Sequence, residues 1–283
     1  MPQVRANGIH LEYETFGDPS RPALLLIMGL GGQMILWPDG FCRALADAGY
    51  YVIRYDNRDV GLSTKIEHGG QPRLMRAAIR SFLRIPVKAP YTLDDMAKDA
   101  LGLLDALGIA KAHFAGLSMG GATALGLAER HPDRLDKVIV CDSPCQSTPQ
   151  SSQQWEERIA VAQKQGIDAL VEPTVGRWFP PETLAKNPPH LDKVRAMFRA
   201  TPVNGFIGCA AALAAHDYAS AIASVKRPVL FLVGEKDAPA PAMRKLHEKL
   251  PGSRYVELPG AGHISNMDRP AEFNRALQDF LAA

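Results

Sequence analysis

The sequence predicts an α/β fold in which a mostly parallel, eight-stranded sheet carries helices on both faces. Three observations predict it. Apolar runs such as Ala23–Ile27 lack polar alternation, which is typical of strands covered on both sides. Helix-forming stretches such as Leu93–Leu107 alternate with these runs, as right-handed parallel crossovers require. A Gly-x-Ser-x-Gly motif at residues 116–120 stands between an apolar run and a helix-forming stretch.

Local signals set the boundaries of the elements. Asn7-Gly8 is a strong hairpin signal, and Gly49 and Gly108 follow helix-forming stretches, where glycine commonly ends a helix. The predicted strands are two within Gln3–Phe16, then Ala23–Ile27, Tyr51–Tyr55, Ala112–Ala115, Lys137–Cys141, Val229–Val233 and Arg254–Leu258. The predicted helices are Asp39–Gly49, Leu93–Leu107, Ala122–Arg130 and Pro270–Leu281.

Two segments interrupt this alternation, so the sequence predicts a core of residues 1–143 and 225–283 with two insertions. Residues 64–90 form the first insertion, and its four arginines at helical spacing favour a surface helix with a solvated basic face over a lid or an anion-binding surface. These arginines are Arg73, Arg76, Arg80 and Arg84. Residues 144–224 form the second, which is rich in helix formers and aromatic residues and is predicted to be a helical cap.

Composition excludes several classes of protein. The 283 residues are 46% hydrophobic and 22% charged, as in ordinary globular proteins. The net charge of +2 argues against a nucleic-acid-binding protein. The four cysteines show no Cys-x-x-Cys spacing, so neither a metal site nor a redox pair is indicated. No signal segment or membrane-length apolar run is present, and we expect a cytoplasmic protein without a stable membrane anchor.

Ser118 lies at the centre of the Gly-x-Ser-x-Gly motif. A strand-to-helix turn this sharp gives the serine strained backbone angles, and side chains at Gly116 or Gly120 would collide across it. The turn lifts the serine hydroxyl out of the sheet edge, within reach of a base and a substrate. The motif is short enough to occur by chance, so its interpretation depends on finding a base, an acid and oxyanion donors elsewhere.

A serine hydroxyl needs a base to act as a nucleophile, and His263 is the candidate. It follows the last predicted strand in a glycine-containing loop that can bring the imidazole over the sheet edge. Asp237 follows the strand Val229–Val233 and is predicted to fix the tautomer of the histidine. Asp142, which ends the preceding strand, is a rival acid, and Glu235 is a weaker one.

Two backbone N–H groups are candidates for an oxyanion hole. One belongs to Met119, directly after the serine at a helix N-terminus. The other belongs to Leu30, with Gly29 permitting the turn, in the glycine-rich loop 28–32. This loop lacks the Gly-Lys-Ser/Thr of a phosphate loop and the Gly-x-Gly-x-x-Gly of a dinucleotide site, so no cofactor is predicted.

Together these segments resemble the α/β-hydrolase superfamily over nearly the full length of the chain. The sequence is similar to bacterial carboxylesterases near aclacinomycin methylesterase and 3-oxoadipate enol-lactonase. The motifs that carry this likeness are Met28-Gly29, Trp37-Pro38-Asp39, Tyr55-Asp56-Asn57-Arg58-Asp59 and Gly116–Gly121. Many relatives have His-Gly in place of Met28-Gly29, so the side-chain role of that histidine is excluded here. Many also have Arg-Gly in place of Arg58-Asp59, and nothing in the sequence indicates what Asp59 does.

The resemblance implies an α/β-hydrolase fold and a serine hydrolase that cleaves small to medium carboxylic esters without a metal or organic cofactor. The expected partner is a small-molecule ester, and the sequence does not indicate an oligomeric state. Met28, Trp37 and Trp178 are candidate walls of the substrate pocket, together with Leu30 and Met119. A lactonase, thioesterase, carbon–carbon hydrolase or perhydrolase with the same three residues is an alternative.

Other classes of function stay open from sequence alone. A ligand receptor built on a hydrolase scaffold can keep all three residues. A membrane-surface lipase could use the arginine-rich segment as an interfacial helix. A peptidase could hold a substrate amine with cap acids, of which Glu156, Glu157 and Glu172 are candidates. Dehalogenase and epoxide hydrolase chemistry usually begins with an aspartate at the position of Ser118, which argues against both.

Overall fold

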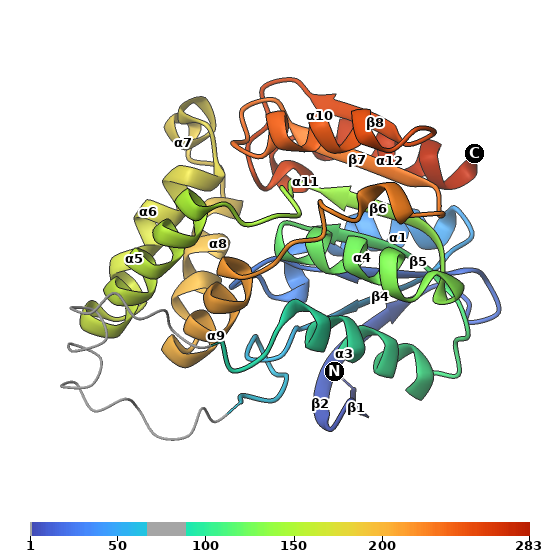
Figure 1. Cartoon of the computed structure of the whole chain (residues 1–283), viewed down its shortest axis with the longest axis horizontal. Coiled ribbons are helices and arrows are strands. Elements are labelled where there is room, and N and C mark those ends of the chain that lie inside the picture. The colour runs from blue at the N-terminus through green and yellow to red at the C-terminus, as the bar shows by residue number, and fades with distance from the viewer. Residues whose placement is uncertain (1, 67–88) are drawn as a thin grey trace.

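The computed structural model describes residues 2–66 and 89–283 and confirms the predicted α/β fold (Figure 1). Its eight strands form one sheet in the order β1-β2-β4-β3-β5-β6-β7-β8. The pairs β1–β2 and β2–β4 are antiparallel, and every other pair is parallel. The predicted basic helix at Pro72–Ile85 lies outside the described residues.

The observed elements follow the predicted order. The strands are β1 (Gln3–Ala6), β2 (Ile9–Phe16), β3 (Ala23–Ile27), β4 (Tyr51–Tyr55), β5 (Ala112–Leu117), β6 (Leu135–Cys141), β7 (Val229–Gly234) and β8 (Arg254–Leu258). The core helices are α1 (Asp39–Asp47), α3 (Leu93–Ala106), α4 (Met119–Arg130), α10 (Ala240–Lys249), α11 (Ser265–Asp268) and α12 (Pro270–Ala282). The helices between β6 and β7 are α5 (Pro149–Gln165), α6 (Asp168–Trp178), α7 (Pro181–Lys186), α8 (His190–Arg199) and α9 (Val203–Ala214).

Local chemistry explains these boundaries. The hairpin turns at Asn7 and Gly8 with φ of 47° and 83°, the left-handed region that these two residues tolerate best. Helix α3 begins at Thr92, whose hydroxyl accepts the Asp95 N–H while the Asp95 carboxylate accepts the Thr92 N–H. Every residue of β3, β5 and β7 is buried, which explains why these strands read as continuous apolar runs.

Helices α5 to α9 lie together beside one end of the sheet (Figure 1). The aromatic residues of this segment fill its interior: Phe179, Phe198 and Phe206 are buried, and Trp178 is 5% exposed. Among residues 2–66 and 89–283, no helix is long and apolar enough to cross a membrane.

A buried ion pair fastens the segment after β4 to helix α3. The Arg58 guanidinium donates to both oxygens of Asp99 at 2.6 and 2.7 Å, and the two side chains are only 9% and 2% exposed. Asn7 donates to the same carboxylate at 2.8 Å. A buried pair of this kind contributes little net stability, but removal of one partner leaves an uncompensated charge in the interior.

We therefore expect Asp99→Ala to lower the free energy of unfolding by about 3–5 kcal/mol, measured by urea denaturation. Asp105→Ala is the matched control. Asp105 lies on the same helix as Asp99 and pairs with Arg134, but the Asp105 side chain is 63% exposed. That substitution should cost no more than about 1 kcal/mol. Equal losses of unfolding free energy in the two variants would contradict the conclusion that burial of the Arg58–Asp99 pair makes Asp99 more costly to remove.

Candidate active site

Ser118 occupies a strained turn between β5 and α4. Its φ of 57° and ψ of −117° lie outside the regions that residues with a side chain normally adopt, at a typical cost of about 1–3 kcal/mol. Glycines make the turn sterically feasible. A Cβ on Gly116 would lie 2.0 Å from the Gly120 carbonyl oxygen, and one on Gly120 would lie 2.1 Å from the Ile27 oxygen. The motif therefore reflects close packing against β3 as well as backbone freedom.

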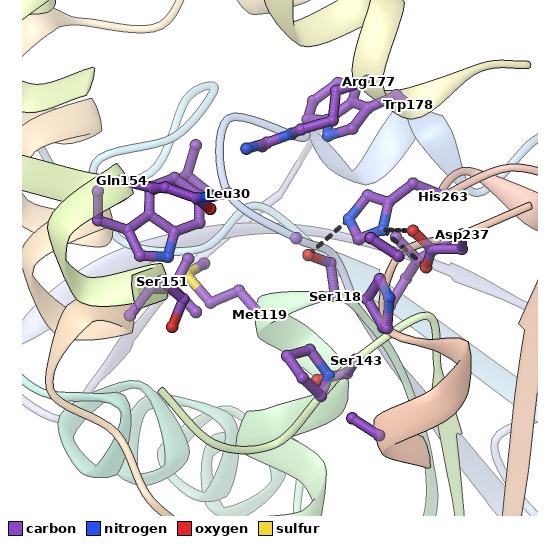
Figure 2. Close-up of a pocket in the computed structure, with 18 of the residues that line it drawn as sticks. Leu30, Ser118, Met119, Ser143, Ser151, Gln154, Arg177, Trp178, Asp237 and His263 are labelled. Carbon is purple, nitrogen blue, oxygen red and sulfur yellow. Dashed lines mark hydrogen bonds and ion pairs between the residues drawn. The ribbon is translucent and has the colours of Figure 1, made fainter. Parts of the chain in front are cut away.

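The structure brings together the three residues predicted to act on substrate (Figure 2). His263 Nε2 lies 2.9 Å from Ser118 Oγ, and His263 Nδ1 lies 3.0 Å from each oxygen of Asp237. An ionised carboxylate only accepts hydrogen bonds, so Nδ1 carries the proton and the Nε2 lone pair faces the serine hydroxyl. This arrangement can remove the serine proton and stabilise the resulting imidazolium.

Backbone contacts hold the loops that carry His263 and Asp237. Lys236 N–H donates to the Ala261 carbonyl at 2.8 Å, which joins the two loops. His263 N–H donates at 2.8 Å to the carbonyl of Trp178 at the end of α6, and the Trp178 ring stacks on the imidazole with 6.3 Å between the ring centres. A Cβ on Gly262 would lie 2.5 Å from that same carbonyl. Glycine at position 262 therefore allows this loop to pack closely against the end of α6.

Neither rival acid contacts the histidine. Asp142 is fully buried at the end of β6, where it accepts the Gly234 N–H at 2.9 Å and the hydroxyl of Ser265. Glu235 accepts the Gly260 N–H at 2.7 Å. Burial, and then repulsion from the neighbouring Asp237, raise the pKa of Asp142 well above its ordinary value.

The loop after β3 lies against the serine. A Cβ on Gly29 would lie 2.9 Å from Ser118 Cβ, so only glycine allows this approach. Among the described residues, no acceptor is found for the Leu30 N–H, and Met119, as the first residue of α4, has no intrahelical acceptor. Both candidate oxyanion donors are therefore available to a ligand.

Two residues that follow β4 brace this loop, and sequence reasoning did not assign them a role. Asn57 Nδ2 donates to the Met28 carbonyl at 2.8 Å, and the Asp56 carboxylate accepts the Met34 N–H at 2.8 Å. Their motif, Asp-Asn-Arg-Asp at a strand end, was the available signal. Strands β3 and β4 are parallel neighbours, so the residues that follow β4 lie beside the loop that follows β3 and can donate to or accept from its backbone.

A cavity of about 400 Å³ opens above Ser118. Met28, Leu30, Met119 and Trp178, all predicted wall residues, line it. Trp37, also predicted as a wall, does not; its ring is fully buried and packs against Phe41 at 5.6 Å and Phe273 at 6.2 Å, beneath α1 and α12. The apolar sequence around Trp37 therefore serves the core.

Several cavity residues escaped the sequence analysis. The segment between β6 and β7 contributes Gln154, Trp155, Arg177 and His216 to the lining. Nothing in the local pattern distinguishes Arg177 from a surface arginine of an ordinary helix. Its position depends on how α5 and α6 pack, which periodicity alone does not specify.

The raised pKa of Asp142 predicts a pH-dependent effect of Asp142→Asn. At pH values below the ordinary aspartate pKa, Asp142 is protonated in both the folded and the unfolded state, so its ionisation does not affect the free energy of unfolding. As pH rises, the unfolded chain releases its proton first, so the free energy of unfolding falls until the raised pKa of Asp142 in the native state is reached. The asparagine variant escapes this loss, and its advantage over wild type in urea denaturation should grow as the pH is raised above about 4, the ordinary pKa of aspartate. Parallel pH profiles would contradict the prediction.

Comparisons with known proteins agree with this geometry. The family model described as alpha/beta hydrolase fold matches residues 22–270. The 3-oxoadipate enol-lactonase 2 of Acinetobacter baylyi is 30% identical over 277 residues, covering 97% of this chain and 94% of that protein. A protein of Caulobacter segnis assigned as the carbamate hydrolase RutD is 29% identical over 95% of each chain. The crystal structure of the enol-lactonase from Burkholderia xenovorans LB400 matches with a TM-score of 0.87 and 32% identity, covering 100% of both chains. The chain belongs to the α/β-hydrolase fold family and is a hydrolase.

Proposed function

We propose that the protein hydrolyses small to medium carboxylic esters, lactones among them, through an acyl-enzyme on Ser118. The observation that carries this proposal is the unbroken chain of hydrogen bonds from Asp237 through His263 to Ser118, at the floor of an open cavity. A serine activated in this way attacks acyl carbons. The similarity to enol-lactonases supports the same chemistry, because a lactone is a cyclic ester.

In the proposed first half-reaction, Ser118 Oγ attacks the ester carbonyl while His263 Nε2 takes the hydroxyl proton. The tetrahedral intermediate collapses, the bond to the alcohol oxygen breaks, and His263 returns the proton to the departing alcohol. In the second half, His263 takes a proton from water, the hydroxide attacks the acyl carbon, and Ser118 leaves with that proton. Asp237 holds the imidazole in place throughout.

The N–H groups of Leu30 and Met119 are proposed to bind the oxyanion of both intermediates. The first extends from a loop held against the serine, and the second lies at the N-terminus of α4, where the helix dipole also favours negative charge. This chemistry requires no metal or organic cofactor.

The cavity supports a substrate of modest size. Its volume of about 400 Å³ is near the small end of the range for ligand sites. Residues 144–224 supply much of the lining, so we propose that this segment is a cap domain on a core of residues 1–143 and 225–283. Carbamate hydrolysis is a second candidate activity, because the same serine can attack a carbamate carbonyl and the Caulobacter relative is assigned as a carbamate hydrolase.

The direct test is steady-state hydrolysis of p-nitrophenyl esters from acetate to dodecanoate. We expect turnover to peak at short or middle chain lengths, because the cavity is small, and to fall at least about 10³-fold in Ser118→Ala. The same assay with a γ-lactone and an alkyl carbamate separates the candidate activities.

Turnover that survives in Ser118→Ala would refute the proposed nucleophile. Absence of turnover on every ester, lactone and carbamate would refute hydrolysis by this site and favour a ligand receptor. Acylation in a single turnover without steady release would favour the same conclusion.

The choice of acid is tested by matched asparagine substitutions. Asp237→Asn should lower kcat by roughly 10³- to 10⁴-fold, because the amide no longer stabilises the productive histidine tautomer. Asp142→Asn should turn over close to the wild-type rate, because Asp142 bonds to Gly234 and Ser265 instead of His263. The reverse ranking in the p-nitrophenyl ester assay would assign the acid to Asp142.

A further inference from the structure

Arg177, in the last turn of α6, brings a positive charge to the cavity above the serine. Figure 2 shows its side chain beside Trp178, with the guanidinium extending over the space between Leu30 and Ser118. The proposed ester hydrolysis makes no use of this group, because its atoms are Ser118, His263, Asp237 and two backbone N–H groups. An arginine held over a largely apolar substrate cavity therefore requires another explanation.

Arg177 has no carboxylate partner among the described residues. The one acidic side chain that lines the described cavity is Asp237, and both its oxygens are bonded to His263. Two other arginines of residues 144–224 are paired, Arg195 with Glu172 and Arg199 with Asp168. By sequence, residues 67–88 contain one acidic residue against five Lys and Arg.

The Arg177 guanidinium lies over an aromatic ring of the same cavity. Its Cζ lies 5.5 Å from the ring centre of Trp155, which also lines the cavity. Arg158 approaches the same ring at 4.7 Å and donates to the Thr174 hydroxyl at 2.8 Å. Stacking of a guanidinium on a ring leaves its N–H edge free to bind a planar anion with two parallel hydrogen bonds.

Desolvation lowers the pKa of both Arg177 and Arg158. The Arg177 side chain is exposed to solvent; desolvation by the surrounding protein lowers its pKa, and the negative charge of Asp237 acts in the opposite direction. Desolvation, and then repulsion from Arg177, lower the pKa of Arg158 to about 9. A bound negative charge would compensate both groups.

We propose that Arg177 binds a carboxylate of the substrate, so that the protein prefers esters or lactones that also carry a free carboxylate. This inference rests on the proposed ester hydrolysis and narrows its substrate class. A carboxylate fits better than a phosphate dianion, because its plane and single charge match one guanidinium in a cavity with largely apolar walls, where the carboxylate of Asp237 would repel a second negative charge.

The test compares anionic esters with neutral amide isosteres. Monoethyl glutarate is paired with ethyl 4-carbamoylbutanoate, which places the charge on the acyl side. The pair 4-acetoxybutanoate and 4-acetoxybutanamide places it on the alcohol side. We expect kcat/KM of wild type to favour the anion in at least one pair.

The ratio of kcat/KM between anion and neutral ester should fall roughly 10- to 100-fold in Arg177→Gln, the range for loss of a charge-assisted hydrogen bond. Arg177→Lys keeps the positive charge but not the planar guanidinium, so its ratio should lie between those of the wild type and Arg177→Gln. Arg199→Gln is the matched control: it removes a cap arginine outside the cavity and should keep the wild-type ratio.

Equal rates on both members of each pair in wild type would overturn the inference, as would an anion preference that persists in Arg177→Gln. Calorimetric binding of the same four compounds to Ser118→Ala separates this inference from the proposed function, because it needs no turnover. Anion binding that is lost in Ser118→Ala/Arg177→Gln supports the site even if no ester is hydrolysed. Equal binding of anions and amides would refute it.

Discussion

The strained backbone of Ser118 is the constraint on which the rest of the site depends. A positive φ at a serine is sustained only where neighbouring elements pack closely, and here β3, β5 and α4 meet with glycine at each contact. This packing directs the hydroxyl away from the sheet and toward His263. It also leaves the first N–H of α4 free beside the nucleophile. One local conformation thus positions both the proposed nucleophile and a proposed donor to the oxyanion.

His263, the proposed base, is held beside Ser118 by contacts with separate parts of the chain. His263 is fixed by a carboxylate that follows β7 and by the backbone carbonyl of Trp178 in the cap. The cap therefore contributes to the geometry of the proposed chemistry as well as to the walls of the cavity. Since the Trp178 ring also stacks on the imidazole, displacement of α6 would disturb the base and the adjacent Arg177 together.

Much of this arrangement was predictable because it depends on local patterns. Hairpin, cap and glycine signals placed the strands and helices, and strand order in a parallel sheet brought Ser118, Asp237 and His263 to one edge. The choice between Asp237 and Asp142 was harder, since both follow neighbouring strands and only their hydrogen-bond partners distinguish them. Trp37 and Arg177 lay beyond sequence reasoning. An aromatic residue and an arginine give the same pattern in a core or surface helix as in a cavity wall, and tertiary packing decides between them.

The measurement that tests the central claim most directly is mass spectrometry of protein quenched in acid during turnover of p-nitrophenyl acetate. If Ser118 is the nucleophile, the intact protein gains the mass of one acetyl group, and proteolysis places that group on the peptide containing Ser118. The adduct should disappear when the ester is exhausted, because water releases the acyl group. An acetyl group on another residue, or continued turnover in which no covalent intermediate can be trapped, would contradict the account.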